Sequence, residues 1–168
     1  MIFVTVGTHS AGFPRLVKAM DELVGTVGET VVIQLGSTVY TPTHASAFCF
    51  APQSEMEHWY EAASVIVSHA GAGSILLAQK YGKPLVLAPR LKKHGEHIDD
   101  HQLELAAALQ ESGRAVMVED MDQLAAAINQ ARQLKVVASS NKSQLITALK
   151  ARLDQMEMEQ ALMILNTS

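Results

Sequence analysis

The segment V-I-V-S-H-A-G-A-G-S, residues 65–74, carries the clearest structural signal in this sequence. Its first four residues are apolar and mostly β-branched, which predicts a buried strand over residues 65–68. A loop with glycines follows, and the apolar spacing after it predicts a helix over residues 74–81. A strand that passes through a small-residue loop into a helix is the repeating unit of parallel α/β folds.

The same alternation of strand and helix continues in both directions from this segment. Short runs rich in Val and Ile predict strands over residues 2–6, 31–35, 47–51, 65–68, 85–88 and 115–118. Helical patterns predict helices over residues 14–23, 54–63, 74–81, 98–111 and 121–132. We therefore expect an α/β fold with a Rossmann-like parallel sheet of about six strands and helices on both faces.

The last part of the chain has a different pattern, because no strand is predicted after residue 138. We expect one domain over residues 1–138 and a helical tail over residues 139–168. Apolar side chains in the tail recur at helical spacing and share one face: Leu145, Leu149, Leu153 and Met156. Two interpretations stay open, because this face can pack on the chain's own sheet or bind a partner protein.

Composition narrows the class of protein. The chain has 168 residues, of which 48% are hydrophobic, and this is enough for one domain with its own core. The formal net charge of −4 argues against a nucleic-acid-binding protein, and the single Cys49 cannot form a disulfide within the chain. The N-terminus lacks a basic leader, and polar residues interrupt the uncharged residues 62–79. We therefore expect neither a secretory signal nor a membrane span.

Three loops follow predicted strands at the sheet edge where ligands bind in open parallel folds. The first, residues 7–12, contains glycines and hydroxyls and leads to Pro14, and it suits either an anion or a purely structural turn. The second, residues 68–74, has small residues before a helix, so a diphosphate can lie against the first-turn N–H groups. Ser74 is expected to cap this helix or to bind phosphate.

The third loop, residues 89–102, is the most polar part of the chain. Its histidines lie beside carboxylates, and His97 and His101 would share one helical face, as metal ligands often do. The spacing is not that of the H-E-x-x-H motif, and no cysteine joins the cluster. Carboxylates and a glutamine at a helix start equally suit sugar hydroxyls, so we favour hydroxyl binding over a metal site.

Taken together, these segments resemble a known family. Residues 65–74, 82–90 and 95–106, with residues 3–8 and 13–17, are similar to the C-terminal, donor-binding domain of GT-B glycosyltransferases of family 28. The likeness spans roughly residues 1–133. Within the family, the chain resembles the catalytic partner of the two-part eukaryotic N-acetylglucosaminyltransferase of dolichol oligosaccharides. A P-R pair followed by G-E-H-x-D-D-H-Q makes it more similar still to bacterial exopolysaccharide and capsule subunits of PssE type.

The resemblance implies the residues of a nucleotide-sugar site in the domain 1–138. His9 and His69 are the candidate catalytic residues, and Gln102 matches a glutamine that touches the donor sugar. The other implied donor-binding residues are Gly7, Thr8, Ala70, Gly71, Ala72, Gly73, Ser74, Arg90, Glu96, His97, Asp100 and His101. Leu77 stands where the peptidoglycan enzyme has a ribose-binding glutamate, so Glu96 or a backbone group is expected to replace it. Arg90 or a lysine would stabilise the leaving phosphates without a metal.

The resemblance also implies a function. We expect the donor-binding, catalytic subunit of a two-component glycosyltransferase that moves a hexose or hexuronic acid from a UDP-sugar to a lipid-diphosphate-linked sugar. No cofactor and no metal are expected. The acceptor site would belong to a membrane-associated partner subunit, which would hold this cytoplasmic chain at the inner face of the membrane. The alternatives are a non-catalytic nucleotide-sugar-binding or stimulatory subunit and a metal-dependent hydrolase.

Overall fold

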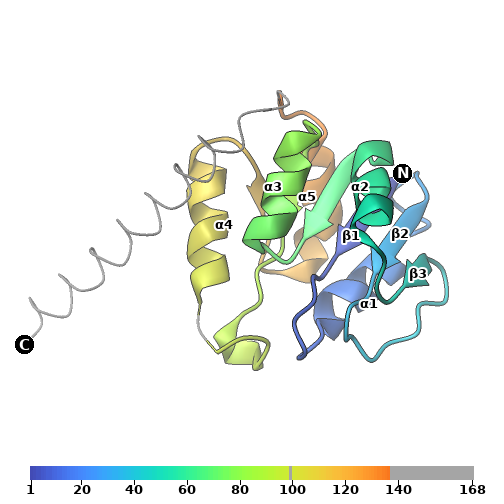
Figure 1. Cartoon of the computed structure of the whole chain (residues 1–168). Helices are drawn as coiled ribbons and strands as arrows, with labels where there is room; N and C mark the ends of the chain where they lie inside the picture. The colour runs from blue at the N-terminus through green and yellow to red at the C-terminus, as the bar shows by residue number, and fades with distance from the viewer. Residues whose placement is uncertain (99, 137–168) are drawn as a thin grey trace, which may run out of the picture.

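A single sheet of six parallel strands forms the centre of the fold (Figure 1). The computed structural model describes residues 1–98 and 100–136. The strands lie in the order β3-β2-β1-β4-β5-β6, and all neighbours are parallel. Their bounds are Ile2–Thr5 (β1), Val31–Gln34 (β2), Ser46–Phe48 (β3), Val65–Ser68 (β4), Leu85–Leu87 (β5) and Val116–Met117 (β6). The predicted six-stranded parallel sheet is confirmed.

Helices cover both faces of this sheet. The α-helices are Pro14–Glu22 (α1), Gln53–Ala62 (α2), Ala72–Lys80 (α3), His101–Glu111 (α4) and Leu124–Ala131 (α5). Two 3₁₀ turns, Lys92–His94 (η1) and Met121–Gln123 (η2), precede α4 and α5. Side chains of α1 and α5 join the hydrophobic core on one face, and side chains of α2, α3 and α4 join the core on the other (Figure 1).

The chain changes direction across the sheet at its central strand, β1. From β1 it continues through α1 to β2 on one side, whereas β4, β5 and β6 lie on the other side. The helices that follow β1 and β4 cover opposite faces, so the loops at the ends of these two strands diverge. Thr5 of β1 is in register with Ser68 of β4. Such a divergence leaves a crevice at the carboxyl edge of the sheet, where α/β proteins bind ligands.

Helix α4 begins later than the sequence predicts. The predicted helix over residues 98–111 starts at His101. A left-handed Gly95 (φ 68°) ends the turn η1, and the Asp100 carboxylate accepts a hydrogen bond from the Lys92 N–H (3.0 Å). This bond ties Asp100 to the preceding turn, so His97 lies outside the helix. The prediction that His97 and His101 share a helical face is therefore wrong.

Other boundaries also differ from the prediction, most of them by one residue. Helix α3 starts at Ala72, two residues earlier than predicted. Strand β3 spans Ser46–Phe48, because the carbonyl of Cys49 turns to accept the Gly36 N–H (3.0 Å) at the end of β2. The predicted helix over residues 121–132 is divided into η2 and α5, with the Asp120 carboxylate accepting the N–H of Asp122 (3.0 Å).

The predicted helical tail, residues 139–168 with the apolar face of Leu145, Leu149, Leu153 and Met156, lies outside the described residues. Both of its interpretations stay predictions. Within residues 1–98 and 100–136, none of the helices has the length and hydropathy needed to cross a bilayer.

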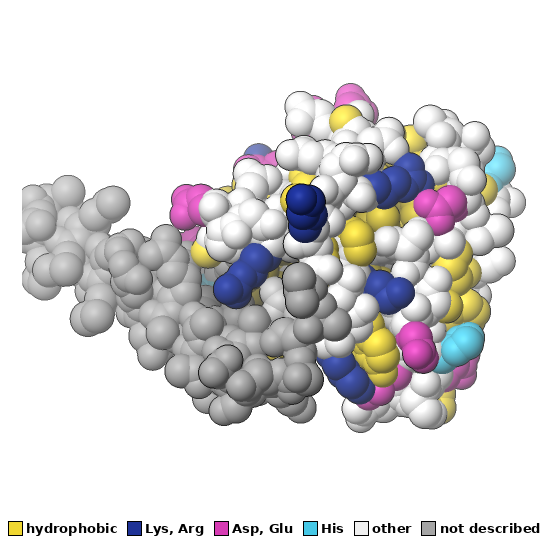
Figure 2. All heavy atoms as spheres, turned by 90° about the horizontal axis from the view of Figure 1, so that it is seen from above, with side chains coloured by type: hydrophobic (Ala, Val, Ile, Leu, Met, Phe, Trp, Pro, Cys, Tyr) yellow, Lys and Arg dark blue, Asp and Glu magenta, His cyan; other side chains and the backbone are white. Residues whose placement is uncertain are grey.

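Charged side chains of both signs are mixed on one face of the molecule. On the face seen in Figure 2, Lys and Arg side chains lie among acidic, hydrophobic and uncharged groups. Three lysines pair with nearby carboxylates: Lys18 with Glu22 (3.9 Å), Lys80 with Glu57 (2.7 Å) and Lys93 with Glu119 (3.7 Å). Such exposed pairs contribute little to stability.

Asp21 at the end of α1 anchors the loop between β2 and β3. Its side chain is buried and accepts hydrogen bonds from the backbone N–H groups of Thr43 (2.9 Å), His44 (2.8 Å) and Ala45 (2.8 Å), and from the Tyr40 hydroxyl (3.0 Å). Burial alone would raise the pKa of the Asp21 carboxyl, but these hydrogen bonds outweigh burial and hold it well below its usual range. The ionised carboxylate is thus the form that holds the loop.

We predict that Asp21→Ala lowers the free energy of unfolding by about 2–3 kcal/mol at pH 7, because buried donors lose a charged acceptor. Chemical denaturation measures this loss. A carboxyl with a depressed folded-state pKa stabilises the protein above its unfolded pKa of about 4, and this stabilisation disappears as the pH falls further. The difference in stability between the parent and Asp21→Ala should therefore shrink below about pH 4.

Glu22→Ala, at the next and exposed position, is the control and should change stability by less than about 0.5 kcal/mol. An Asp21→Ala effect as small as that of the control would contradict the anchoring role.

Candidate functional site

A cleft of about 440 Å³ opens at the carboxyl ends of β1 and β4, where the strand order reverses. The loops after both strands line it, together with the end of β2 and the start of α2. The predicted site residues that line this cleft are Gly7, Thr8, His69, Gly71, Gly73 and Ser74. The structure thus brings the first and second predicted loops together at one place.

His69 is a buried residue of this cleft that packs against two glycines. Its ring is 8% exposed, and its Nδ1 lies 3.3 Å from the carbonyl oxygen of Thr5. A Cβ on Gly71 would lie 2.3 Å from His69 Nε2, and a Cβ on Gly7 would lie 2.6 Å from its Cε1. Gly7 also has a φ of +73°, which favours glycine. Both glycines are therefore required by the imidazole itself, before any ligand is considered.

The surroundings of His69 set its charge. Burial lowers its pKa to about 4, and the nearby charges of Arg90, His9 and His97 act in the same direction, against the hydrogen bond with Thr5 O. The ring is thus neutral at physiological pH. If Nδ1 donates its proton to the Thr5 carbonyl, Nε2 is unprotonated. Nε2 is then the ring nitrogen that lies next to Gly7 and Gly71.

The N-terminus of α3 opens at this cleft. Its N-cap residue is Gly71, and the described part of the chain contains no side chain that caps it. Ala72 and Gly73 are exposed, and a Cβ on Gly73 would meet nothing within 4 Å. Uncapped N–H groups at a helix N-terminus, in front of an open glycine, form a binding surface for an anion such as a phosphate.

Ser74 does not cap this helix, because it is the third residue of α3. Ser74 and Thr5 both lie next to the buried Tyr60 hydroxyl. Burial raises the pKa of Tyr60 to about 12, so the hydroxyl stays protonated. The capping interpretation of Ser74 is wrong, and its contact with Tyr60 joins α3 to α2.

Gln34 is a cleft residue that the sequence reasoning missed. Its amide oxygen accepts from Thr5 Oγ1 (2.7 Å) and from the Gly7 N–H (3.1 Å), and its Nε2 donates to the carbonyls of Gly7 (3.0 Å) and Cys49 (3.1 Å). The buried side-chain amide of Gln34 thus holds the loop after β1 by bonding to both the N–H and the C=O of Gly7. A glutamine at the end of the apolar run V-V-I-Q is the sequence signal that could have identified it.

One side of the cleft is apolar. Phe50 lines it with 58% of its surface exposed, and Leu77 of α3 lines it too. An exposed aromatic ring at the rim of a cleft is a stacking surface for a planar ligand group. Phe50 lies two residues after the end of β3 and falls within the predicted strand 47–51, so its exposure was not predicted. Because position 77 is a leucine, this part of α3 lacks the ribose-binding glutamate that the resemblance to the peptidoglycan enzyme would place here.

Arg90 and Glu96 of the third loop lie inside the fold rather than on the cleft surface. Arg90 is fully buried, its guanidinium donates to the carbonyls of Val6 (2.9 Å) and Gly12, and its Nε has no partner among the described residues. Glu96 is 9% exposed and forms a two-bond pair with Arg15, with distances of 2.8 and 2.9 Å. The implied direct contacts of Arg90 with phosphate and of Glu96 with ribose do not fit these positions.

The remaining predicted residues of the third loop lie nearer the surface. Asp100 and His101 are exposed, and the Gln102 amide oxygen accepts the N–H of Arg90 (3.2 Å), so Nε2 is the part of Gln102 that can donate to a ligand. The His97 ring contacts that of His9 in the first loop, with centroids 5.3 Å apart. The first and third loops therefore meet beside the cleft. Within residues 1–98 and 100–136, no cluster of three or more His, Cys, Asp or Glu side chains has a geometry suited to a metal ion.

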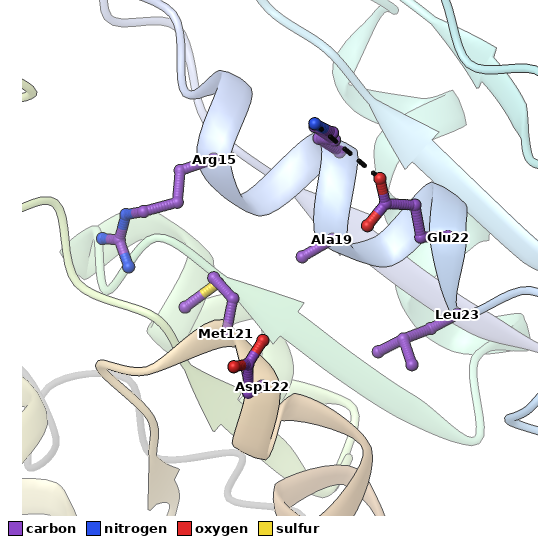
Figure 3. A pocket seen from close by; sticks show the side chains of 7 residues that line it. Arg15, Ala19, Glu22, Leu23, Met121 and Asp122 are labelled. Carbon is purple, nitrogen blue, oxygen red and sulfur yellow. Dashed lines mark ion pairs between the residues drawn. The ribbon is translucent and has the colours of Figure 1, made fainter.

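A second hollow, of about 450 Å³, lies between α1 and η2 (Figure 3). Ala19, Leu23 and Met121 form its apolar part, and the Lys18–Glu22 ion pair stands at its rim. None of the predicted site residues lines it. It is separate from the carboxyl ends of β1 and β4, so the cleft between those strands is the candidate site.

Two named proteins are similar to this chain in sequence. The chain is 34% identical over 123 residues to the Homo sapiens UDP-N-acetylglucosamine transferase subunit ALG13, an alignment that covers 67% of this chain and 10% of that protein. It is 39% identical over 69 residues to a transferase of Parabacteroides distasonis, with 41% of this chain and 18% of that protein covered. The latter is named UDP-N-acetylglucosamine--N-acetylmuramyl-(pentapeptide) pyrophosphoryl-undecaprenol N-acetylglucosamine transferase. The chain thus spans a small part of the length of each relative.

Solved structures agree in fold. An NMR solution structure of ALG13 superposes with a TM-score of 0.61 at 22% identity, covering 88% of this chain and 94% of that one. The calicheamicin glycosyltransferase CalG4 superposes with a TM-score of 0.62 at 16% identity, covering 95% and 42%. The sequence model of the family described as glycosyltransferase family 28 C-terminal domain matches residues 1–156 of this chain. With the reversed strand order and the cleft at β1 and β4, this match shows that the chain belongs to the glycosyltransferase family 28 C-terminal domain family.

Proposed function

We propose that this chain is the donor-binding half of a two-component glycosyltransferase that uses a UDP-sugar. The observation that carries the proposal is the uncapped N-terminus of α3, which opens through Gly73 onto the cleft. Helix N-termini bind phosphate through N–H groups and the helix dipole, so a diphosphate is held there without a metal. Both named relatives are UDP-N-acetylglucosamine transferases, which favours a UDP-linked donor.

The other cleft residues suit the remaining parts of such a donor. The exposed ring of Phe50 offers a stacking surface for the uracil base, and the apolar Leu77 of α3 lines the same cleft. Gln102 is our candidate for the sugar, since its Nε2 can donate to a hydroxyl. The ribose would then be held by backbone groups, because Glu96 is engaged with Arg15.

Transfer requires a base for the acceptor hydroxyl and a stabilised leaving phosphate. With a pKa of about 4, His69 is a weak base at neutral pH. His9 accepts the Ala11 N–H at Nδ1 (3.2 Å), so its neutral ring carries the proton at Nε2 and can donate to an anion. We infer that His9 donates to the leaving phosphate and that the partner subunit supplies the base.

The acceptor side of the reaction belongs to the partner in this proposal. The human relative is named a transferase subunit, which favours an assembly of two parts. The G-E-H-x-D-D-H-Q segment favours a role in bacterial exopolysaccharide or capsule synthesis, with a hexose or hexuronic acid moved to a lipid-diphosphate-linked sugar. A membrane-associated partner would then hold the chain at the inner face of the membrane.

We predict that Gly73→Val weakens UDP binding by at least about tenfold, because the added side chain fills the space in front of the α3 N–H groups. Isothermal titration calorimetry with UDP measures the effect. Gly25→Val is the matched control, since a Cβ at Gly25 also meets nothing within 4 Å and this turn lies away from the cleft. Both variants should keep the melting temperature of the parent to within a few degrees.

Unchanged UDP affinity in a folded Gly73→Val protein would contradict the diphosphate site. Absence of binding by the parent chain to UDP, UDP-glucose, UDP-glucuronate and UDP-N-acetylglucosamine would contradict the proposed donor class. If the parent binds a UDP-sugar and His9→Ala leaves transfer unchanged in the assembled complex, the non-catalytic binding subunit is the better description.

A second prediction concerns Gln102. Gln102→Glu keeps the oxygen that accepts from Arg90 N–H but replaces the Nε2 donor, so it should weaken binding of the preferred UDP-sugar by about 1–3 kcal/mol and leave UDP affinity nearly constant. Parallel titrations with UDP and with the UDP-sugar measure both affinities. Equal losses for the two ligands would show that Gln102 does not contact the sugar.

A further inference from the structure

Arg15, the second residue of α1, makes contacts far beyond its own helix. Its guanidinium donates to both oxygens of Glu96 and to the carbonyls of Pro89 (3.0 Å) and Glu119 (2.8 Å). Pro89 and Glu96 belong to the loop after β5, and Glu119 follows β6. One planar side chain therefore holds two loops at the carboxyl edge of the sheet against the start of α1.

Glu96 completes this connection from the other side. Besides the two bonds from Arg15, its carboxylate accepts the backbone N–H of Leu91 (3.0 Å), and the Glu96 N–H returns to the Leu91 carbonyl (3.3 Å). Burial raises the pKa of Glu96, but the hydrogen bonds from Arg15 and Leu91 outweigh it and keep the pKa below its usual range. The carboxylate is thus charged and occupied by protein donors.

The pair determines where the third loop lies. Residues 91–96 close on themselves through Leu91 and Glu96, and Arg15 fixes this closed turn to α1. The Lys92 N–H then binds Asp100, and α4 begins at the next residue. Gln102 lies in the first turn of α4 and bonds to the Arg90 N–H, so its position depends on the same turn.

Arg90 is a second cation that holds the first and third loops together. The Arg90 guanidinium lies 4.9 Å and that of Arg15 lies 5.2 Å from the centre of the Phe13 ring. Arg90 also donates to Val6 and Gly12 at the two ends of the first loop. The first and third loops are thus fixed relative to each other through groups that do not line the cleft.

From these contacts we propose that the Arg15–Glu96 pair is a positioning device for donor-sugar recognition. The pair holds the turn of residues 91–96, and thereby Asp100 and Gln102, at the sugar end of the cleft. The proposal rests on the proposed UDP-sugar function. The pair acts through Gln102 and does not itself touch the donor. The diphosphate site is on α3, on the opposite face of the sheet from α1, and it does not depend on this pair.

The test compares Arg15→Gln with the parent chain in titrations with UDP and with the UDP-sugar that the parent binds best. UDP affinity should stay within about twofold, whereas the additional affinity contributed by the sugar should fall by about fivefold or more. Lys18→Gln is the control on the same helix, since Lys18 is exposed and pairs only at 3.9 Å with Glu22. Arg15→Lys keeps the charge but not the fork of donors, so it should restore the sugar contribution only in part.

A second measurement does not depend on the ligand. Hydrogen exchange of the Leu91 amide, which donates to Glu96, should accelerate by at least about tenfold in Arg15→Gln and in Glu96→Gln, and stay unchanged in Lys18→Gln. If Arg15→Gln does not fold, Glu96→Gln decides both measurements. Equal losses for UDP and UDP-sugar, or an unchanged sugar contribution, would overturn the positioning role. If the parent binds no UDP-sugar, the proposed function fails, and unchanged exchange at Leu91 still overturns the claim that the pair holds the loop.

Discussion

The packing of His69 between two glycines is the contact on which the geometry of the cleft depends. The imidazole occupies the volume that Cβ atoms of Gly7 and Gly71 would need, so the loops after β1 and β4 approach each other closely only with glycine at both positions. This approach leaves Gly71 as the N-cap of α3 without a capping side chain. The open N-terminus of α3 is therefore a consequence of how His69 is buried, with Gln34 holding the other loop in place.

In the function we propose, the site divides into a nucleotide end and a sugar end with different supports. The nucleotide end is built on β4, α2 and α3, and its parts line the cleft directly. The sugar end depends on the third loop, which Arg15 and Arg90 hold through bonds to Glu96 and to backbone carbonyls. A division of this kind lets the residues that recognise the sugar vary without disturbing the diphosphate site.

The fold was predictable because β-branched runs and small-residue loops alternate along the chain, and residues 65–74 alone contain one complete strand, loop and helix start. The convergence of Gly7 with Gly71 at one cleft was also predictable from the rule for parallel strands. The roles of Arg90 and Glu96 were not predictable, because a charged residue in a polar loop has the same sequence pattern whether it binds a ligand or a protein group far away in the sequence, such as Arg15, which lies 81 residues from Glu96. Arg15 had no signal of its own, since its partners are distant in the sequence.

Chemical-shift mapping of the ¹⁵N-labelled chain with UDP tests the central claim most directly, because it locates the nucleotide without any substitution. The account predicts that the largest shifts fall on the amides of Gly7 and residues 71–74, with smaller changes around Phe50, and that Ala19 and Met121 in the hollow between α1 and η2 do not respond. Shifts centred on that hollow, or no shifts at saturating UDP, would contradict the assignment of the cleft at β1 and β4 as a nucleotide-sugar site.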